Sequence, residues 1–398
     1  MTSDQLIESP LQVPKASALT FGALFAGESL LRSMNVSVIP LQAYDLLGSS
    51  QKVSMVSTAV SFAVLLTTLL LPYIFRNARR RWIYSFGIAV MVASACFFAS
   101  YTVAGQVVGL YLRNAGAAVL SITLSLYIMD NIRRTELTKS EPLRLATSTL
   151  SWVIGPALGA WLYATHGPIV AQLAVVGAAA ALAAGFWYTR LYDPGTLPSG
   201  TLTSFSPLAN AVAFFAKPRL RLAWSIAFGR SCFWSVTFIY GPLLMVEGGL
   251  AKTTAGLLLS LTQFALPVGL LYGKAARRWG VRPIITFSFV GMTMTALLAG
   301  LFGKSAVLSA AICLLIGAFC ATGLDGVGGI PFLRAVKPSQ RQQMTSVYRT
   351  FIECAELLPG FVFAILLLYF EIGVVFLALS VLMAYMAWVS WRYLPKSM

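Results

Sequence analysis

The sequence predicts an all-α integral membrane protein with twelve transmembrane helices in two pseudo-symmetric six-helix bundles. Three observations predict this fold class: the composition, the length of the apolar runs and a repeat at about half the chain length. Of the 398 residues, 58% are hydrophobic and only 11% are charged, which does not suit a water-soluble globule. The apolar runs are continuous over ~18 residues or more, which is enough to cross a bilayer as a helix. A membrane β-barrel would instead show short segments of alternating polarity.

The sequence contains twelve such apolar runs. In chain order the first six cover residues 17–44, 53–75, 82–101, 105–130, 145–166 and 169–190. The last six cover residues 221–246, 253–273, 283–302, 306–333, 344–370 and 372–391. Because an α-helix rises 1.5 Å per residue, each run can cross the ~30 Å hydrocarbon core of a bilayer.

The longest interruption separates the first six spans from the last six. It opens with proline and glycine and closes with "SPLANAVAFFAKP", which can lie as an amphipathic helix on the inner membrane surface. The expected organisation is therefore two bundles joined by a cytoplasmic loop, with a short tail at each end. The parts are residues 1–16 (N-terminal tail), 17–192 (first bundle), 193–220 (central loop), 221–392 (second bundle) and 393–398 (C-terminal tail).

The two halves share a short sequence repeat. "GES" at residues 27–29 is matched by "GRS" at 229–231, and "PL" at 40–41 by "PL" at 242–243. Both matches have the same offset, about half the chain length. An equal offset across six-span halves predicts parallel repeats, related by an axis along the membrane normal.

The formal net charge of +16 is explained by membrane topology. With the N-terminus placed in the cytoplasm, twenty-two of the 29 lysine and arginine residues fall on the cytoplasmic side of the predicted spans. This is the asymmetry of the positive-inside rule. The sequence thus predicts a bacterial inner-membrane protein with both termini in the cytoplasm, whose partner is the lipid bilayer and not a nucleic acid.

Cofactor and metal chemistry is not expected. All five cysteines fall inside predicted spans, so neither a disulfide framework nor metal-ligand spacing is indicated. The sequence contains a single histidine and no phosphate-binding loop, so no cofactor and no metal are predicted, and energy must come from an ion gradient.

The predicted fifth span carries a family motif. In "SWVIGPALGA", residues 151–160, Gly155, Pro156 and Gly159 resemble the antiporter motif G-x3-G-P-x2-G-G, with Ser151 and Ala160 at two of its glycine positions. The motif, the six-plus-six arrangement and the basic inner loops together resemble the major facilitator superfamily, and within it the drug/proton antiporters.

Two further motifs support this resemblance. "GLYLRNAGAAVLS" in the fourth predicted span resembles the motif that places an arginine, here Arg113, in the proton pathway of such antiporters. The loop "GKAARRWGVRP" keeps Gly273, Arg278, Gly280 and Arg282 of the superfamily's basic gating loop, but has an arginine where the pattern has an acid.

Eight charged side chains fall at bilayer depth within the predicted spans, where a charge costs at least ~2.5–3.5 kcal/mol and persists only against protein or water. The four acids and four arginines balance, so they can be held as pairs. Those near the membrane centre are expected to be proton-coupling or cavity charges: Glu28, Arg32, Arg113, Arg230 and Glu356. Those toward the cytoplasm, with one acid from the end of the fourth span, are expected to form an inner gate: Asp130, Asp325, Arg349 and Glu353.

The superfamily arrangement implies that Glu28, Arg113, Arg230 and Asp325 line a central cavity. Glu28 and Arg32 are i, i+4 neighbours on one helical face, and the repeat places Glu28 opposite Arg230. A carboxylate that exchanges arginine partners during a transport cycle can take up a proton on one side and release it on the other. The alternative is a static pair, Glu28 with Arg32, that only holds helices together.

The resulting hypothesis is a monomeric secondary transporter that exports a small organic solute in exchange for protons. An importer or uniporter of an anionic metabolite is an alternative, because four arginines lie within the membrane. A sensor or scaffold that moves nothing is a further alternative. An enzyme is not expected, because no cluster of nucleophile and base is present.

Overall fold

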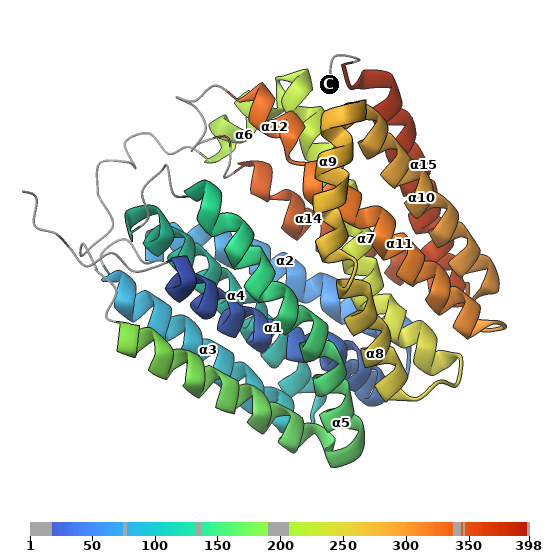
Figure 1. Ribbon diagram of the computed structural model, residues 1–398. Helices are drawn as coiled ribbons and strands as arrows, with labels where there is room; N and C mark the ends of the chain where they lie inside the picture. The colour runs from blue at the N-terminus through green and yellow to red at the C-terminus, as the bar shows by residue number, and fades with distance from the viewer. Residues whose placement is uncertain are drawn as a thin grey trace, which may run out of the picture.

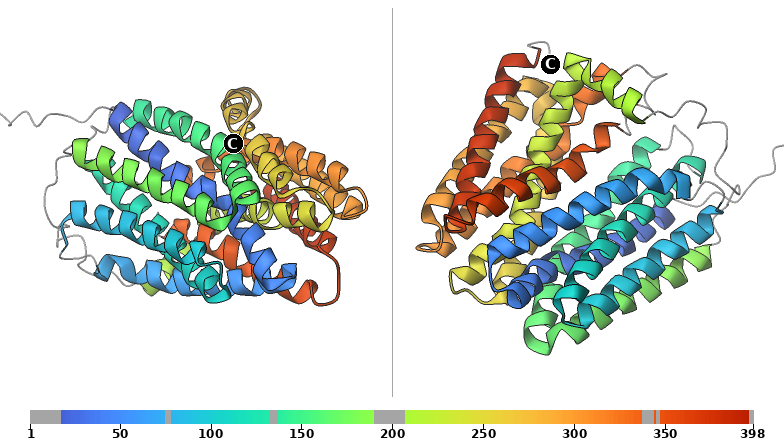
Figure 2. Two further views of the ribbon diagram at one scale, coloured as in Figure 1. Left: turned by 90° about the horizontal axis from the view of Figure 1, so that it is seen from below. Right: turned by 180° about the vertical axis from the view of Figure 1, so that it is seen from behind.

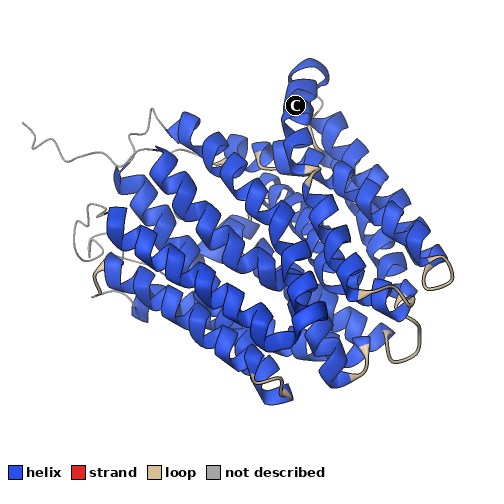
Figure 3. Ribbon diagram, turned by 60° about the horizontal axis from the view of Figure 1, so that its bottom comes forward, coloured by secondary structure: helices blue, strands red, loops and turns tan. Residues whose placement is uncertain are grey.

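The computed structural model describes residues 18–74, 78–131, 137–189, 207–336, 344 and 347–395. These residues form helices joined by short turns, without a β-strand among them (Figures 1 and 3). Each predicted span overlaps a helix. In the first half these are α1 (Ala18–Leu47), α2 (Ser50–Ile74), α3 (Arg80–Ala99), α4 (Val103–Asn131) and α5 (Leu137–Thr189).

The second half has more and shorter helices. They are α6 (Pro207–Phe215), α7 (Pro218–Glu247), α8 (Lys252–Gln263), the 3₁₀ turn η2 (Leu266–Val268), α9 (Gly269–Trp279), α10 (Val281–Phe302), α11 (Val307–Val327), α12 (Ile330–Ala335), α14 (Phe351–Leu366) and α15 (Gly373–Tyr393). A helix satisfies its own backbone hydrogen bonds, which an apolar chain in lipid requires.

Helix α5 contains two predicted spans. Its 53 residues would extend for ~80 Å if straight, far more than a bilayer needs. The helix turns back at Gly167, whose φ of 84° and ψ of −179° suit glycine. The following residue is Pro168, which restricts the backbone before it. The predicted boundary between residues 166 and 169 is therefore confirmed, and Figure 1 shows the reversal at the lower end of α5.

Three predicted spans of the second half are less regular than expected. The segment from α8 to α9 bends by 43°, and Pro267 lies in the turn between the two helices. Helix α11 ends at Val327 before the separate short helix α12. Helix α14 begins at Phe351, after a turn at Thr350 that follows the helical residues 347–349. Arg349 therefore lies in the short helical segment just before α14.

The surface of the protein is apolar, as lipid contact requires. Large hydrophobic side chains are exposed on both halves, including Phe86 (52%), Phe287 (69%) and Val381 (70%), far beyond what a soluble monomer shows. Within the described ranges, seven helices are long and apolar enough to cross a membrane, or eight if α8 to α9 is one bent span. One of the seven includes the reversal at Gly167.

The helices form two bundles, and the hydrophobic core of the second continues into the first through residues such as Leu41, Val53 and Ala160. In the first, Tyr84, Met91 and Leu120 are buried between α1, α3, α4 and the second part of α5. In the second, Phe289 and Phe376 are among the buried residues between α7, α10, α11 and α15. The domain boundaries remain a prediction, because residues 190–206 lie outside the described ranges.

The bundles meet at one end of the molecule, here called the closed end. It carries the reversal of α5, the α1–α2 turn and the start of α8, and the ribbons of the two bundles diverge from it toward the end with α6 and α12 (Figures 1 and 2). A Cβ on Gly256 of α8 would lie 2.2 Å from the Cβ of Ala160 on α5. Only glycine allows α5 and α8 to approach so closely.

Candidate functional site

A cavity of about 210 Å³ lies between the two bundles. Its wall comes from α1, α2, α4 and α5 of the first half and from α7 and α14 of the second. The polar and charged side chains that line it are Arg32, Asn35, Ser57, Ser61, Gln106, Arg113, Asn114, Ser235 and Glu356. Two arginines and one glutamate therefore face a small space that both halves enclose.

Arg113 makes two hydrogen bonds, both to neutral acceptors. Its Nη1 donates to Oδ1 of Asn114 at 2.9 Å, and its Nη2 donates to the backbone carbonyl of Arg32 at 3.2 Å. Its Nε is buried without a hydrogen-bond partner in the described part of the chain. No carboxylate among the described residues forms an ion pair with Arg113. The guanidinium thus retains unused donors at the cavity wall.

Glu356 contributes a carboxylate to the cavity wall. The side chain comes from α14, and Oε2 accepts a long hydrogen bond of 3.5 Å from the hydroxyl of Ser61 on α2. This contact joins the two bundles, because Ser61 and Glu356 belong to different halves. Within the described ranges no cation forms an ion pair with Glu356.

Glu28 lies beside the cavity and does not line it. Its side chain is fully buried, and its Oε1 lies 3.7 Å from Nη1 of Arg32, whose side chain is 32% exposed. The i, i+4 neighbourhood inferred from sequence is thus present. The structure differs from the expectation that Glu28 faces the cavity and Arg230, because helix α1 turns Glu28 into its own bundle.

Arg230 pairs with Asp325 within the second bundle. Its Nη1 donates to Oδ1 of Asp325 at 3.0 Å, and Nε1 of Trp234 donates to Oδ2 at 3.2 Å. About a quarter of each charged side chain is exposed, 27% for Arg230 and 26% for Asp325. Neither residue lines the cavity, and Asp325 forms its ion pair with Arg230.

The remaining residues of the expected inner gate are Asp130, Arg349 and Glu353. The side chain of Asp130 lies outside the described part of the chain. Arg349 is exposed before α14, and Glu353 is partly buried in its first turn. The gating role of these residues remains a prediction.

The antiporter-like motif packs α5 against α1. A Cβ on Gly155 would lie 2.0 Å from the Oγ of Ser33, and one on Gly159 would lie 2.0 Å from the carbonyl oxygen of Met34. The hydroxyl of Ser37 donates to the carbonyl of Pro156 at 2.7 Å. The motif thus holds in place the helix that carries Glu28 and Arg32.

The basic loop connects α9 to α10 and is distant from the cavity lining. Gly280 has a φ of 94°, which favours glycine there, and Arg278 is exposed in the last turn of α9. Arg282 lies over the ring of Trp391 on α15, 4.6 Å from its centroid, and donates to the carbonyl of the same residue. Gly273 has open space around it.

A polar cluster at the closed end was not predicted from sequence. The Nζ of Lys252 on α8 lies 2.5 Å from Oδ2 of Asp45 on α1. The hydroxyl of Tyr163 on α5 donates to the same oxygen at 2.5 Å, and the Lys252 ammonium lies 5.2 Å from the centroid of the Tyr163 ring. These contacts tie the two bundles together. The sequence feature that could have indicated this cluster is an acid at the end of one apolar run and a lysine at the start of another.

A second contact lies beside this cluster. The hydroxyl of Ser50 on α2 donates to Glu247 on α7, and Nζ of Lys304 lies 3.3 Å from the same carboxylate. Burial lowers the pKa of the Lys304 ammonium, but Glu247 and then Glu371 outweigh it, so the pKa is raised from its usual value. Lys304 therefore stays charged around neutral pH, and its contribution to this contact is lost only when the pH rises through the raised pKa.

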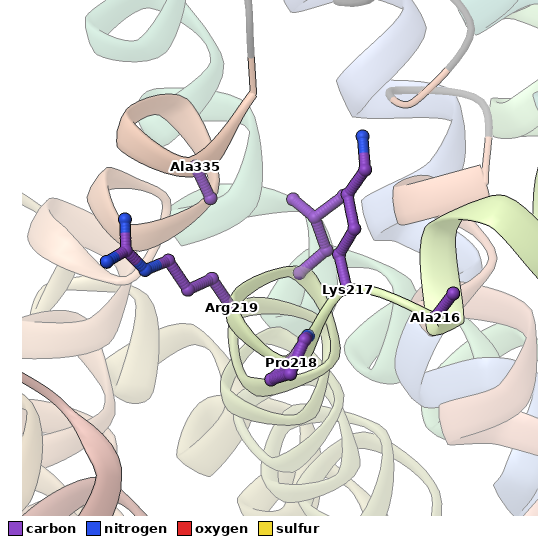
Figure 4. A pocket seen from close by; sticks show the side chains of 6 residues that line it. Ala216, Lys217, Pro218, Arg219 and Ala335 are labelled. Carbon is purple, nitrogen blue, oxygen red and sulfur yellow. The ribbon is translucent and has the colours of Figure 1, made fainter.

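A separate hollow of about 410 Å³ lies at the start of α7. Figure 4 shows Lys217 and Arg219 extending to different sides of this helix start, with Ala335 of α12 nearby. Four of its lining residues, 216–219, are exposed. It therefore belongs to the surface and shares no lining residue with the cavity between the bundles.

Two helical bundles in a membrane, with a polar cavity between them and contacts that close one end, define the class of secondary transporters. The sequence profile of the Major Facilitator Superfamily matches residues 21–332, and the chain belongs to this superfamily. It is therefore an integral membrane transporter of small solutes and not an enzyme. No curated protein matches the sequence.

Solved transporter structures have the same fold. A POT family transporter in complex with 5-aminolevulinic acid has a TM-score of 0.75 at 11% identity, over 93% of this chain and 94% of that one. The nucleoside transporter NupG has a TM-score of 0.71 at 14% identity, over 95% and 99%. A bacterial homologue of the iron transporter ferroportin in its inward-facing state has a TM-score of 0.67 at 14% identity, over 94% and 100%. At these identities the likeness shows the fold alone.

Proposed function

We propose that this transporter carries a small organic solute through the cavity between its bundles by alternating access, with protons as the coupling ion. The observation that carries the proposal is the cavity itself, in which Arg113 of one bundle and Glu356 of the other face a common space. A rocking motion of the bundles separates or joins these charges, so that binding and conformation are linked.

Glu356 is the proton carrier that the geometry supports best. It lines the cavity, whereas Glu28 is enclosed in its own bundle beside Arg32. Its hydrogen bond from Ser61 is long, 3.5 Å, and breaks when the two bundles move apart. Glu28 remains the alternative carrier, because its partner Arg32 lines the same cavity.

Export in exchange for protons is the proposed direction. It is supported by the resemblance of Gly155, Pro156 and Gly159, and of Arg113, to motifs of antiporters, and by the close α1–α5 packing that the glycines allow. The placement of basic residues supports cytoplasmic termini in a bacterial inner membrane. In that orientation the closed end faces outward and the cavity is reached from the cytoplasm.

Import or uniport of an anionic metabolite is the second candidate. The specific observation in its favour is that two guanidinium groups line the cavity and only one carboxylate does.

Purified protein in liposomes with a pH-sensitive dye inside tests both proposals. A panel of organic acids, amines and uncharged solutes is applied to either side, and solute-induced proton movement is recorded. We expect Glu356→Gln to abolish proton movement and to leave solute exchange in place. Glu371→Gln, a matched change at a side chain that is 76% exposed, is expected to behave as the natural protein. Unchanged proton movement in Glu356→Gln would remove this residue from the mechanism. The direction of net solute movement relative to an imposed proton gradient distinguishes export from import.

A further inference from the structure

Among the described residues, no carboxylate forms a direct ion pair with Arg113. Arg32 and Arg113 both line the cavity, and Glu356 is the carboxylate that does. Glu28 lies 3.7 Å from Arg32 behind the wall, which leaves Arg113 without an ion-pair partner among the described residues. An arginine at this depth normally has a counter-charge, because an uncompensated charge in a low-dielectric surrounding is costly.

The donors of Arg113 are also incompletely used. A guanidinium has five N–H groups, and Arg113 donates to two neutral oxygens, from Asn114 and the Arg32 backbone. Its buried Nε has no partner within the described ranges. The planar fork of an arginine matches a carboxylate, which accepts two parallel hydrogen bonds. A carboxylate is therefore the group that would complete the hydrogen bonds of Arg113.

The rest of the wall is aromatic and aliphatic. Trp152 of α5 and Phe238 of α7 both line the cavity, and their rings stack with centroids 5.8 Å apart across the two bundles. Ile39 and Leu110 lie on the same wall. A cation on one part of the wall and flat apolar surface on another fit a solute with one charged and one apolar end.

The volume limits the size of that solute. About 210 Å³ is below the ~300–1,000 Å³ of pockets for drug-sized ligands. A benzoate-sized molecule is of this scale.

We propose that the cavity binds a small monocarboxylate, with its carboxylate on Arg113 and its hydrocarbon part against Trp152 and Phe238. The proposal rests on the proposed transport function and names the substrate class of that site. Binding of the anion gives Arg113 a direct ion pair and uses donors that are otherwise unpaired. The anion and the carboxylate of Glu356 are both attracted by the positive charge of Arg113. The solute and the proposed proton carrier therefore share one site.

Three matched series of probes test the class of ligand: benzoate with benzamide and benzylamine, phenylacetate with its amide and amine, and butyrate with its amide and amine. Each is added to the purified full-length protein in detergent, and binding is followed by the thermal unfolding temperature and by calorimetry. We expect at least one acid to raise the unfolding temperature and to bind at least tenfold more tightly than its amide and amine. The proposal is overturned if no acid binds, or if an amide or amine binds as tightly as its acid.

Variants then test the residue. We expect Arg113→Gln to weaken binding of the acid by about 10- to 100-fold, the range for a hydrogen bond to a charged group. Arg113→Lys keeps the charge and is expected to retain part of the affinity. Arg392→Gln is the matched control, an exposed arginine at the end of α15, and is expected to bind as the natural protein does. If Arg113→Gln folds poorly, Arg113→Lys is used in its place. Unchanged or partly retained affinity of Arg113→Lys for the acid supports the proposal. Selective binding of amides by Arg113→Lys overturns the proposal.

The liposome assay separates this proposal from the transport function. If uncharged or cationic solutes are moved and acids are not, the substrate class proposed here is wrong and the transport function stands. If acids bind through Arg113 but no solute of any class is moved, the site stands and the transport function fails.

Discussion

The ion pair between Asp45 and Lys252 predicts how firmly the closed end is held. Lys252→Gln removes the charge that joins α8 to α1, where the two groups lie 2.5 Å apart. The side chains are 33% and 19% exposed, so the pair lies between an exposed ion pair, worth ~0.2–1 kcal/mol, and a buried one, whose disruption costs ~3–5 kcal/mol. An intermediate cost of about 1.5 kcal/mol shifts the equilibrium between closed and open forms of this end by about tenfold.

Distance measurements between spin labels follow this equilibrium. Labels at Val103 and Leu308 report on the two bundles, because both residues are exposed, 46% and 63%, at the starts of α4 and α11. The native cysteines are replaced first. We expect Lys252→Gln to raise the ratio of long to short distances by about tenfold. The matched control is Lys52→Gln, an exposed lysine near the start of α2, which should leave the ratio unchanged.

A charge swap completes the test. Asp45→Lys combined with Lys252→Asp restores an ion pair with opposite polarity, and we expect it to return most of the closed population. If Lys252→Gln gives the same ratio as Lys52→Gln, the pair does not hold the bundles together and the reasoning is refuted. If the swap stays as open as Lys252→Gln, the effect comes from something other than the charges, such as the hydrogen bond from Tyr163.

Two further predictions concern the helix that carries the buried acid. Gly159→Ala places a methyl group 2.0 Å from the carbonyl oxygen of Met34 and should destabilise the protein by ~1–3 kcal/mol. The control is Gly177→Ala, which has open space around it and should not lower the unfolding temperature. Equal effects of the two substitutions would contradict the packing argument. Glu28→Gln leaves Arg32 without its counter-charge and should lower the free energy of unfolding by ~3 kcal/mol. Proton coupling in liposomes should persist in this variant. A stable variant that has lost proton coupling would instead identify Glu28 as the proton carrier.

The helices and their boundaries could be predicted to a large extent from the sequence. Long apolar runs can only be helices in a lipid environment, because the backbone must satisfy its own hydrogen bonds. Even the reversal within α5 was visible as the pair Gly167 and Pro168. The irregular parts could not be predicted, because the bend after α8 and the turn at Thr350 before α14 depend on how these segments pack.

The partners of the charged residues required the tertiary structure. Each residue along a helix is rotated by ~100° from the last, so an acid known to lie at a given depth can face its own bundle, the other bundle or the cavity. Sequence alone identified Glu28 and Arg32 as neighbours because they share one helix. It did not identify the pairing of Arg230 with Asp325, which lie 95 residues apart.

The sequence by itself determined the membrane fold, the positions of the helices and the short list of charges within them, because hydropathy and helical spacing are local properties. The tertiary structure decided which charges meet: Arg113 and Glu356 in a common cavity, Glu28 behind its wall, and Asp45 with Lys252 where the bundles touch. The physical reason is that the rotation of each helix about its axis is set by packing against its neighbours, and no single helix carries that information.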